Sequence, residues 1–427
     1  MSVFNSLGSN YDLSFALKAL SPEVAKLVHL RGGITPTNST KKPDLKNFLE
    51  KKYGGETVLL FKGREAITLA LQTLNLPKNS QVAINGFTCY AVYKAIEESG
   101  LKPVLIDIPM DDLNFTRSDL VKHIEKNGNI RAVLVQNTLG FPCDIENISK
   151  ICKENNIFLI EDLAHSVGSI YNNGKEAGRV GDFTMFSFSQ DKIIDGISGG
   201  AMIDRITNNA RPASLGEAGE SRITNHANPS FARQLKDRFY PILTWKIRVL
   251  YDLGLGKILH YILKSLNILS APMDDSLYDF TNLPNFYQSL AQDAFANLKS
   301  DLEHRKKIAK IYASNLPEKI MFVKLNSQID NSSNLRFPIF VQNREDLIKY
   351  LKTKGFYLSD IWYDAPIAPK RFMKKINYLP AGRQVKNDCP NAEKISNTIV
   401  NLPTHKNISE EKAIFITERV NEWLKLQ

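Results

Sequence analysis

Short apolar runs alternate with helical patterns between residues 57 and 204. Seven runs rich in Val, Ile and Phe are typical of buried strands: Thr57–Phe61, Gln81–Ile84, Pro103–Ile108, Ala132–Asn137, Ile157–Asp162, Phe183–Phe188 and Gly199–Asp204. Amphipathic helical patterns separate several of them, at Arg64–Leu74, Tyr90–Ser99 and Ile145–Asn155. This alternation predicts βαβ crossovers and a mainly parallel sheet with helices on both faces. Because ligands bind beyond the carboxyl ends of such strands, functional residues are expected just after strand ends.

The pattern changes beyond about Leu335. A strand pattern at Arg336–Val341, an amphipathic helix at Arg344–Lys354 and a closing helix at Ile408–Leu424 predict a smaller α+β domain. One long helical pattern at Leu283–Leu316 predicts a connecting element. We therefore expect five parts: an N-terminal arm at 1–45, a large domain at 46–205, an insertion at 206–280, a connecting helix at 281–334 and a small C-terminal domain at 335–427.

The composition of the 427 residues narrows the classes of protein to consider. With 43% hydrophobic residues the chain is not a disordered one. Its four cysteines include no CxxC pair and its seven histidines no HxxxH pair, so no disulfide framework and no metal site is predicted. Dinucleotide and P-loop motifs are missing as well. Because neither a signal peptide nor a membrane span is recognisable, we expect a cytoplasmic enzyme.

The net charge of +10 arises from 55 Lys and Arg against 45 Asp and Glu. A basic balance of this size is compatible with nucleic acid, an anionic membrane surface or anionic small molecules as partners, and also with plain solubility. The position of the charge along the chain must decide between them.

The first candidate site lies at Phe61–Ile67, where a strand ends, Gly63 follows and a helix begins. The free amides and the dipole of a first helical turn bind anions, and glycine lets the backbone approach a phosphate closely. Arg64 could add a bidentate contact. Taken alone, an ordinary βα turn is the better interpretation, because short βα loops are common.

The second candidate site is Glu161–His165, at the end of an apolar strand. Asp162 is placed to face a ligand, and His165 could give a second hydrogen bond. A buried carboxylate stays ionised only beside a cation or hydrogen-bond donors. The alternative, in which Asp162 caps a helix, carries equal weight here.

The third candidate site follows the strand at Phe183–Phe188, where Lys192 lies just beyond the strand end and Ser187 five residues before it. A lysine amine in a desolvated cleft has a lowered pKa and can form a Schiff base. Ser187 could reach the same phosphate as Gly63. Taken alone, Lys192 is better interpreted as a solvated loop residue.

The three sites together favour one cofactor. Along one parallel sheet they supply a phosphate cradle, a carboxylate and an amine nucleophile, in that order. Pyridoxal phosphate requires all three: a phosphate site, an anion at its pyridinium nitrogen and a lysine for its aldehyde. The sequence therefore predicts a pyridoxal phosphate enzyme.

The same residues carry a resemblance to the DegT/DnrJ/StrS sugar aminotransferases, which have the fold-type I aminotransferase architecture. The resemblance covers about Lys46–Arg205 and resumes from about Leu283 to the C-terminus. In the first stretch the segments that match family motifs are Gly63–Ile67, Leu105–Ile108, Gly140–Asp144, Glu161–Gly168, Gly181–Asp182, Phe186–Phe188 with Lys192, and Ser198–Gly200. In the second stretch they are Arg305–Ala309 with Tyr312, Pro390–Glu393 and Leu402–His405.

This resemblance implies a role for each candidate residue. Lys192 would hold the cofactor aldehyde and move protons, Asp162 would pair with the pyridinium nitrogen, and His165 would contact the ring hydroxyl. The phosphate would be held by Gly63, Arg64 and Ser187. Three features depart from the family pattern. Arg64 replaces a small hydroxyl residue, and Cys89 stands where the family has the aromatic residue that stacks on the cofactor ring. The family's GxNxR segment, whose Asn contacts the partner subunit's phosphate, is not recognisable, and Asn282 is only a loose candidate for it.

The reaction implied by the resemblance is transfer of an amino group from an amino acid, usually glutamate, to a keto group on a nucleotide-linked sugar. The setting would be synthesis of cell-surface polysaccharide precursors, and the enzyme would be a homodimer. Two alternatives stay open: a pyridoxal phosphate enzyme that acts on a non-sugar carbonyl compound, and a non-catalytic relative that binds a nucleotide sugar or a membrane partner.

Residues 233–269 fall within the expected insertion and contain two amphipathic segments separated by Gly254 and Gly256. Seven Lys and Arg against two Asp give this segment a charge of +5, half of the net charge. A basic amphipathic helix with aromatic residues is typical of a peripheral membrane contact at the inner membrane face. We favour instead a helical hairpin packed on the protein or its dimer mate, because apolar stripes usually face protein; a lid over the site is a third interpretation. Half of the net charge lies in this one segment, and no nucleic-acid-binding motif accompanies it. This position of the charge argues against a nucleic-acid partner.

Overall fold

The computed structural model describes residues 2–20, 44–126, 128–206, 227–270, 280–358, 362–376 and 389–427. All six residues expected in the cofactor site lie within these ranges. Parts of the expected arm and insertion lie outside the described residues, namely 21–43, 207–226 and 271–279.

A seven-stranded sheet forms the centre of the larger part of the molecule, in the order β2-β9-β8-β7-β6-β3-β5. Its strands are β2 (Glu56–Leu60), β3 (Gln81–Asn85), β5 (Lys102–Ile106), β6 (Ile130–Val135), β7 (Phe158–Asp162), β8 (Phe183–Ser187) and β9 (Gly200–Asp204). Five neighbouring strands of this sheet are parallel: β5, β3, β6, β7 and β8. Strand β9 runs antiparallel to both β8 and β2. The expected α/β fold class with a mainly parallel sheet is therefore confirmed. No helix joins β8 to β9, so the chain turns back through a loop that contains Lys192.

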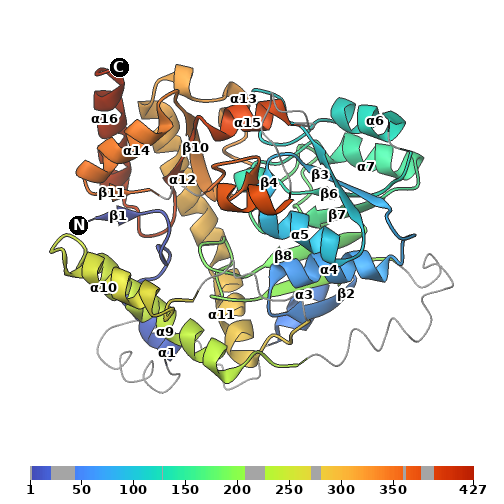
Figure 1. Ribbon diagram of the computed structural model, residues 1–427, viewed down its shortest axis with the longest axis horizontal. Helices are drawn as coiled ribbons and strands as arrows, with labels where there is room; N and C mark the ends of the chain where they lie inside the picture. The colour runs from blue at the N-terminus through green and yellow to red at the C-terminus, as the bar shows by residue number, and fades with distance from the viewer. Residues whose placement is uncertain are drawn as a thin grey trace.

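Helices cover both faces of this sheet, as Figure 1 shows. Alternate residues of one strand point to opposite faces, so Ala132 packs with α4 (Gly63–Thr73) and α5 (Tyr90–Glu98), whereas Val133 packs on the other side. That other face carries α3 (Leu45–Tyr53), α6 (Arg117–Lys126), α7 (Ile145–Glu154) and α11 (Asn285–Ala296). The sequence pattern did not predict α6, because Leu120 is the one buried side chain of this charged helix.

The connecting element is two helices, not the single long helix expected. α11 ends at Ala296 and α12 (Leu298–Asn315) begins two residues later. At Asn297 the backbone has φ −94° and ψ 0°, and the side-chain Nδ2 donates to the Asp293 carbonyl at 2.8 Å. An asparagine amide that competes for backbone acceptors disfavours continuation of a helix.

The C-terminal part has its own hydrophobic cluster, to which α12 contributes Ile308, Ala309 and Tyr312. Its elements are β10 (Arg336–Phe340) paired antiparallel with β13 (Ile399–Pro403), α14 (Arg344–Thr353) and α16 (Glu410–Leu424). The short strand β1 (Val3–Phe4) pairs with β11 (Phe356–Tyr357), so the N-terminus lies on this part of the molecule. The boundaries expected for the five parts stay a prediction.

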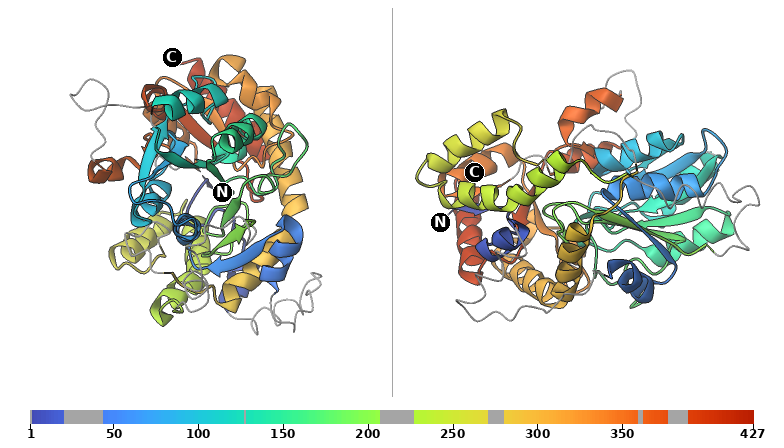
Figure 2. Two further views of the ribbon diagram at one scale, coloured as in Figure 1. Left: turned by 90° about the vertical axis from the view of Figure 1, so that its right-hand side faces the viewer. Right: turned by 90° about the horizontal axis from the view of Figure 1, so that it is seen from below.

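The insertion forms the two helices expected, α9 (Phe231–Val249) and α10 (Leu255–Ser265). α9 packs along α1 (Leu13–Leu20), and α10 packs against α9 at the outer end (Figures 1 and 2). Among the described residues, no helix is long and apolar enough to cross a membrane.

Candidate active site

The N-terminus of α4 lies between the ends of β8 and β9. The side chain of the N-cap residue Lys62 makes no capping hydrogen bond to this helix. A Cβ on Gly63 would lie 2.8 Å from the Cβ of Ser187, and one on Gly200 would lie 2.6 Å from the Gly63 nitrogen. Two glycines therefore allow Ser187 and the helix N-terminus to form one small polar surface.

Arg64, in the first turn of α4, is only 9% exposed. Its charge and that of Lys192 act to lower the pKa of the Cys89 thiol, although burial raises this pKa on balance. A phosphate dianion held by helix amides is well matched by a guanidinium beside it. Arg64, Cys89 and Lys192 thus lie close enough to share one electrostatic environment.

Asp162 ends β7 and is 2% exposed. One carboxylate oxygen, Oδ1, accepts the Ala164 N–H at 2.8 Å. Burial raises the pKa of this carboxyl to about 6, against the opposing effects of that hydrogen bond and of the Lys192 charge. Within the described parts of the chain, no basic side chain comes within ion-pair distance of Asp162. A cation placed beside it would relieve the cost of burying its charge.

Lys192 lies in the loop between β8 and β9, where the residue is half-buried. Its Nζ is 5.1 Å from the ring centroid of Trp362. Burial lowers the pKa of the amine, with Arg336 acting in the same direction and Cys89 and Asp162 in the opposite one. A desolvated amine of lowered pKa is the form of lysine that acts as nucleophile and base.

His165 is buried and held as one neutral tautomer. Its Nδ1 accepts the Leu139 N–H at 3.3 Å and lies 3.3 Å from the Tyr363 hydroxyl. Burial, together with the charges of Lys192 and Arg336, lowers its pKa well below the usual range. Because Nδ1 accepts, the proton is on Nε2, which can donate to a ligand.

Further hydrogen bonds hold the Tyr363 hydroxyl in its place beside His165. Gln136 Nε2 donates to the Tyr363 hydroxyl at 2.8 Å, and Gln136 Oε1 accepts from the Thr88 hydroxyl. The ring of Tyr363 stacks on Phe87 with a centroid distance of 4.5 Å. These contacts join three segments that are far apart in the sequence.

Trp362 and Tyr363 are site residues that the sequence analysis missed. The ring of Trp362 lies 5.7 Å from that of His165, in addition to its contact with Lys192. The pairing of β12 (Ile367–Ala368) with β4 (Thr88–Cys89) brings their segment to the site. Burial raises the pKa of the Tyr363 hydroxyl and the nearby Cys89 adds to this effect, so Tyr363 lies close to the position at which an aromatic residue was expected.

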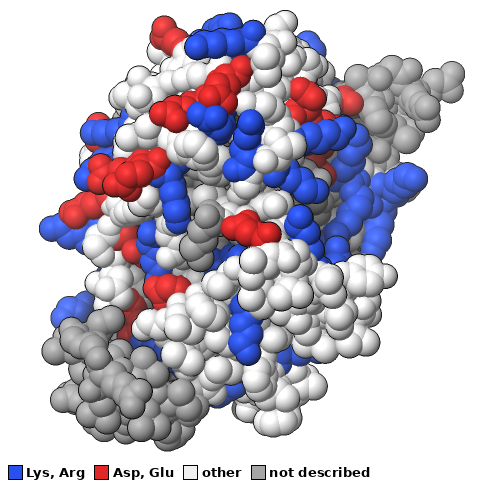
Figure 3. Space-filling view, turned by 90° about the vertical axis from the view of Figure 1, so that its left-hand side faces the viewer, with Lys and Arg blue, Asp and Glu red and all other residues white. Residues whose placement is uncertain are grey.

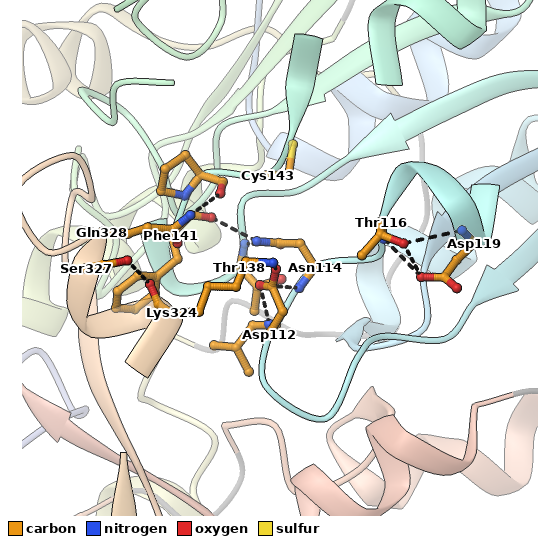
Figure 4. A network of polar contacts seen from close by, with 12 residues as sticks. Asp112, Asn114, Thr116, Asp119, Thr138, Phe141, Cys143, Lys324, Ser327 and Gln328 are labelled. Carbon is orange, nitrogen blue, oxygen red and sulfur yellow. Dashed lines mark hydrogen bonds and ion pairs between the residues drawn. The ribbon is translucent and has the colours of Figure 1, made fainter. Parts of the chain in front are cut away.

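The turn that contains Leu139 is itself fixed by polar contacts (Figure 4). Asn114 accepts the Thr138 N–H at 2.9 Å and donates to the Phe141 carbonyl at 3.0 Å. On the other side of this turn, Gln328 donates to the Pro142 carbonyl at 3.2 Å. The donor to His165 Nδ1 is therefore held in place by the loops after β5 and β6.

The N-terminal arm fixes the loop of Lys192 from the opposite side. Asn10 Nδ2 donates to the Lys192 carbonyl at 3.2 Å and to Asp195 at 3.0 Å. Ser9 donates to Asp191 at 3.1 Å, and the Tyr11 hydroxyl to Asp195 at 2.8 Å. Arm and loop thus form one buried polar unit.

Helix α9 closes this unit, because Arg248 donates to the backbone carbonyls of Ser9 and Tyr11. A second contact joins α9 to the framework directly: the buried Asp237 accepts from Ser198 at 2.8 Å and from Tyr287 at 3.1 Å. Part of the insertion is therefore bound to the loop that carries Lys192.

These residues fit pyridoxal phosphate. The cluster offers a helix N-terminus with an adjacent serine, a buried carboxylate with no ion-pair partner among the described residues, a histidine that presents Nε2–H and a desolvated lysine. The donor set matches the phosphate, pyridinium, hydroxyl and aldehyde of the cofactor one by one. Among the described residues, no group of His, Cys, Asp and Glu side chains is arranged to hold a metal ion.

The structure brings together all six residues expected from the sequence: Gly63, Arg64, Asp162, His165, Ser187 and Lys192. They lie at the carboxyl ends of the strands, where the parallel sheet was expected to bind its ligand. The role of each residue toward the cofactor stays a prediction.

Comparison with known proteins adds a family. The sequence model of the DegT/DnrJ/EryC1/StrS aminotransferase family matches residues 43–215 and 279–421, which is well over half of the chain. The stretch between the two matches contains α9 and α10. These two helices therefore lie outside the stretches that the family model matches.

Similar individual proteins are sugar aminotransferases by name. The chain is 22% identical over 378 residues to GDP-perosamine synthase of Escherichia coli O157:H7, covering 88% of each. It is 25% identical over 364 residues to the dTDP-3-amino-3,6-dideoxy-alpha-D-galactopyranose transaminase of Aneurinibacillus thermoaerophilus, covering 84% of each. Among solved structures, a DegT DnrJ EryC1 StrS aminotransferase from Brucella abortus matches with a TM-score of 0.64 and 18% identity over 96% of both chains, which supports the fold.

Proposed function

Because the chain belongs to the DegT/DnrJ/EryC1/StrS aminotransferase family, whose members depend on pyridoxal phosphate, we propose that it transfers an amino group to a keto group of a nucleotide-linked sugar. The donor is an amino acid, with glutamate as the first choice. The product serves the synthesis of cell-surface polysaccharides or related amino sugars. The enzyme works as a cytoplasmic homodimer and has no nucleic-acid partner.

One observation carries this proposal: the buried Asp162 and His165 and the half-buried Lys192 lie together near the N-terminus of α4. A non-catalytic relative would have no use for a desolvated lysine whose loop is held by Ser9, Asn10 and Tyr11 of the arm and by Asp237 of α9. Buried ionisable groups with shifted pKa values gather at functional sites for this reason. The named relatives supply the substrate class, since two of them are transaminases or synthases of nucleotide-linked amino sugars.

When bound, pyridoxal phosphate supplies an aldehyde for the amino group and a ring that accepts electrons. The first turn of α4, Arg64 and Ser187 bind the phosphate and so fix the position of the cofactor. Asp162 holds a proton on the pyridinium nitrogen through its negative charge. His165 donates Nε2–H to the ring hydroxyl, and Trp362 excludes water from Lys192.

Lys192 acts in two ways. Its neutral amine would hold the aldehyde of the cofactor, and Nζ would carry the proton that moves between donor and acceptor. Burial, which lowers the pKa of the amine, keeps it in the form that can accept that proton. General acid–base catalysis of this kind is worth roughly 10²–10⁴-fold in rate.

The cofactor part of the proposal is tested by its covalent link. Protein purified with pyridoxal phosphate should be yellow, and borohydride reduction followed by peptide mass spectrometry should find the cofactor on Lys192. Lys192→Ala should lose the modified peptide, whereas Lys246→Ala, at an exposed lysine of α9, should keep it. A colourless protein that takes up no cofactor would overturn the proposal.

The substrate part is tested by products. The holoenzyme is incubated with glutamate and a panel of keto-sugar nucleotides, and mass spectrometry searches for the amino sugar and 2-oxoglutarate. Amination of one panel member supports the nucleotide-sugar assignment and identifies the sugar. Turnover of simple 2-oxo acids with no reaction on any keto sugar would favour the alternative of a non-sugar carbonyl substrate.

A further inference from the structure

The insertion exposes an unusual number of large apolar side chains. Most of those in the described part of the chain that are well exposed lie between Phe231 and Ile268. In and beside α10 they are Leu253 (73% exposed), Leu255 (55%), Ile258 (59%), Tyr261 (75%), Ile262 (45%) and Leu266 (64%). Single exposed apolar residues need no explanation, but a contiguous group on one helix indicates an interaction surface.

These residues form one face of α10, which we call the outer face. Leu255, Ile258, Ile262 and Leu266 follow one another at intervals of three or four residues, and Tyr261 lies beside them. Another side of α10 is already used: Gly256 and Leu263 are buried, and Gly256 lies against Ile247 and Tyr251 of the insertion. The outer face is therefore available while α10 is firmly packed.

Close packing at Gly256 fixes how α10 is presented. A Cβ there would lie 2.2 Å from the Ile247 carbonyl of α9, and the Gly256 N–H donates to the Leu250 carbonyl at 2.8 Å. α9 in turn is bound to the catalytic framework through Asp237 and Arg248. The direction of the outer face is thus set by the fold.

Charge along the helix points to the kind of partner. α10 contains Lys257 and Lys264 and no acidic residue. Both lysines are exposed and lie on one side of the outer face. The space-filling view from this side shows a broad area of mostly uncharged residues, bordered by Lys and Arg and also by Asp and Glu (Figure 3). Apolar residues bordered by lysines complement the surface of an anionic bilayer.

We propose that the outer face of α10, with Lys257 and Lys264, docks the enzyme on an anionic membrane surface. Eleven helical residues span about 16 Å, which is about half the thickness of the hydrocarbon core. The helix would therefore lie along the interface with its apolar side chains among the lipids and its lysines at the headgroups. This inference is independent of the reaction that the active site performs.

A second copy of the chain fits this face less well. In a symmetric pair the same patch meets itself, so Lys257 and Lys264 of one copy would approach those of the other. α10 offers no acidic side chain to compensate them, and like charges in contact are unfavourable. A membrane with anionic lipids supplies the missing charge.

The test uses the full-length holoenzyme and sedimentation with vesicles. Binding is expected to vesicles of phosphatidylcholine with phosphatidylglycerol, and at most weakly to phosphatidylcholine alone. Each lysine contributes about 1 kcal/mol at such a surface, so Lys257→Gln and Lys264→Gln should each weaken binding about fivefold and reduce its dependence on salt. Ile258→Glu with Ile262→Glu should abolish binding.

Matched controls keep the result specific. Val323→Glu changes an apolar residue that is 62% exposed on α13 (Val323–Ser327), and it should leave vesicle binding unchanged. Because all these positions are exposed, the variants should fold, and a thermal melt checks that they do. Absence of vesicle binding at low salt, or equal binding by the Ile258/Ile262 variant, overturns the proposal. So does conversion of a dimer to a monomer by that variant, measured by light scattering, because the face then serves a second copy.

Discussion

Two regions of the molecule handle buried charge and exposed apolar surface in opposite ways. In the active site Asp162 and His165 are almost fully buried and Lys192 is half-buried, and their neighbours come from the sheet, the N-terminal arm and the C-terminal part. In α10 the apolar side chains of the outer face are exposed, and the neighbours of the helix come from the insertion. The active site removes charged groups from water, although water would stabilise them. The outer face of α10 exposes apolar groups to water, where they are unfavourable.

Both arrangements cost free energy in the unliganded protein, and ligand binding can offset that cost. A desolvated carboxylate and amine become favourable when a cofactor cation and aldehyde join them. An apolar helix face becomes favourable when lipid covers it. The comparison therefore predicts that substitutions in the active site change chemistry at small cost in stability, whereas the insertion divides into an inner part that matters for stability and an outer face that does not.

The largest effect is expected at the catalytic amine. Lys192→Ala should reduce the transamination rate by about 10²–10⁴-fold or more, because the proton carrier is lost. Its melting temperature should stay the same or rise, since burial of the amine is costly in the folded protein. Lys246→Ala, an exposed lysine in α9, should change neither quantity. Steady-state kinetics and a thermal melt of both variants measure the difference; a destabilised but active Lys192→Ala protein would contradict it.

The next effect concerns the joint between the two regions. Asp237, on α9, is fully buried and accepts from Ser198 and Tyr287, and Arg233 forms an ion pair with it at 3.2 Å. Asp237→Ala leaves these partners buried without their acceptor, so the free energy of unfolding should fall by about 3–5 kcal/mol. Urea denaturation measures this loss.

Asp252 provides the matched control for that variant, because it also belongs to the insertion but is exposed. Its hydrogen bond to the Ser2 N–H at 3.0 Å is worth about 1 kcal/mol or less. Asp252→Ala should therefore unfold nearly as the parent protein does. Equal losses in the two variants would mean that α9 is not joined to the framework through Asp237.

A smaller effect is expected for cofactor affinity and its pH dependence. Burial raises the pKa of Asp162 to about 6, so the carboxyl gains a proton as the pH falls through that value. The protonated form no longer attracts a pyridinium, and the affinity for pyridoxal phosphate should decrease below about pH 6 and be constant above it. Asp162→Asn should weaken binding by roughly 2 kcal/mol, about thirtyfold, and remove this pH dependence. Absorbance titrations from pH 5 to 8 decide; an unchanged pH profile in the variant would assign the titration to another group.

The strands of the central sheet could be predicted from the sequence, whereas contacts between distant segments around the active site could not. All seven strands were predicted, because each is a nearly continuous apolar run, and the site residues follow from strand ends. The break at Asn297 was missed, since the apolar pattern of α11 and α12 continues across it. Ser9 and Asn10 have meaning only beside Asp191 and Asp195, which no local pattern shows.

In the insertion, the helices could be predicted from the sequence, but the surroundings of their apolar faces could not. Periodicity predicted two amphipathic segments, and α9 and α10 confirm them. The preferred interpretation, packing on the protein or its dimer mate, holds for the inner face of α9, where Tyr240 and Ile247 are buried. The outer face of α10 is not covered by the described residues of this chain, and its packing on a dimer mate stays untested. A stripe of apolar residues shows that a face is amphipathic, whereas tertiary structure alone shows which stripe the protein itself covers.

A further prediction concerns the aromatic residue that sequence could not supply. Trp362 lies over Lys192 at 5.1 Å, near the place where Cys89 replaces the expected ring. Trp362→Ala should weaken cofactor binding about tenfold, because ring contacts of this kind are worth about 1 kcal/mol or somewhat more. Trp362→Phe should recover most of the loss. If the alanine variant binds the cofactor as the parent does, Trp362 covers the lysine without contributing to the cofactor site.

The smallest effect tests how the histidine is held. Tyr363→Phe removes the hydroxyl that lies 3.3 Å from His165 Nδ1 and accepts from Gln136. A single neutral hydrogen bond is worth about 0.5–1.5 kcal/mol, so the rate and the cofactor affinity should fall only about threefold to tenfold. The Leu139 N–H still donates to Nδ1, and its turn is fixed by Asn114, so the proton should stay on Nε2. Nitrogen chemical shifts of the imidazole measure the tautomer directly. A change of tautomer in Tyr363→Phe would show that the Tyr363 hydroxyl of the C-terminal part keeps the proton on Nε2. The Leu139 N–H would then be insufficient to do so.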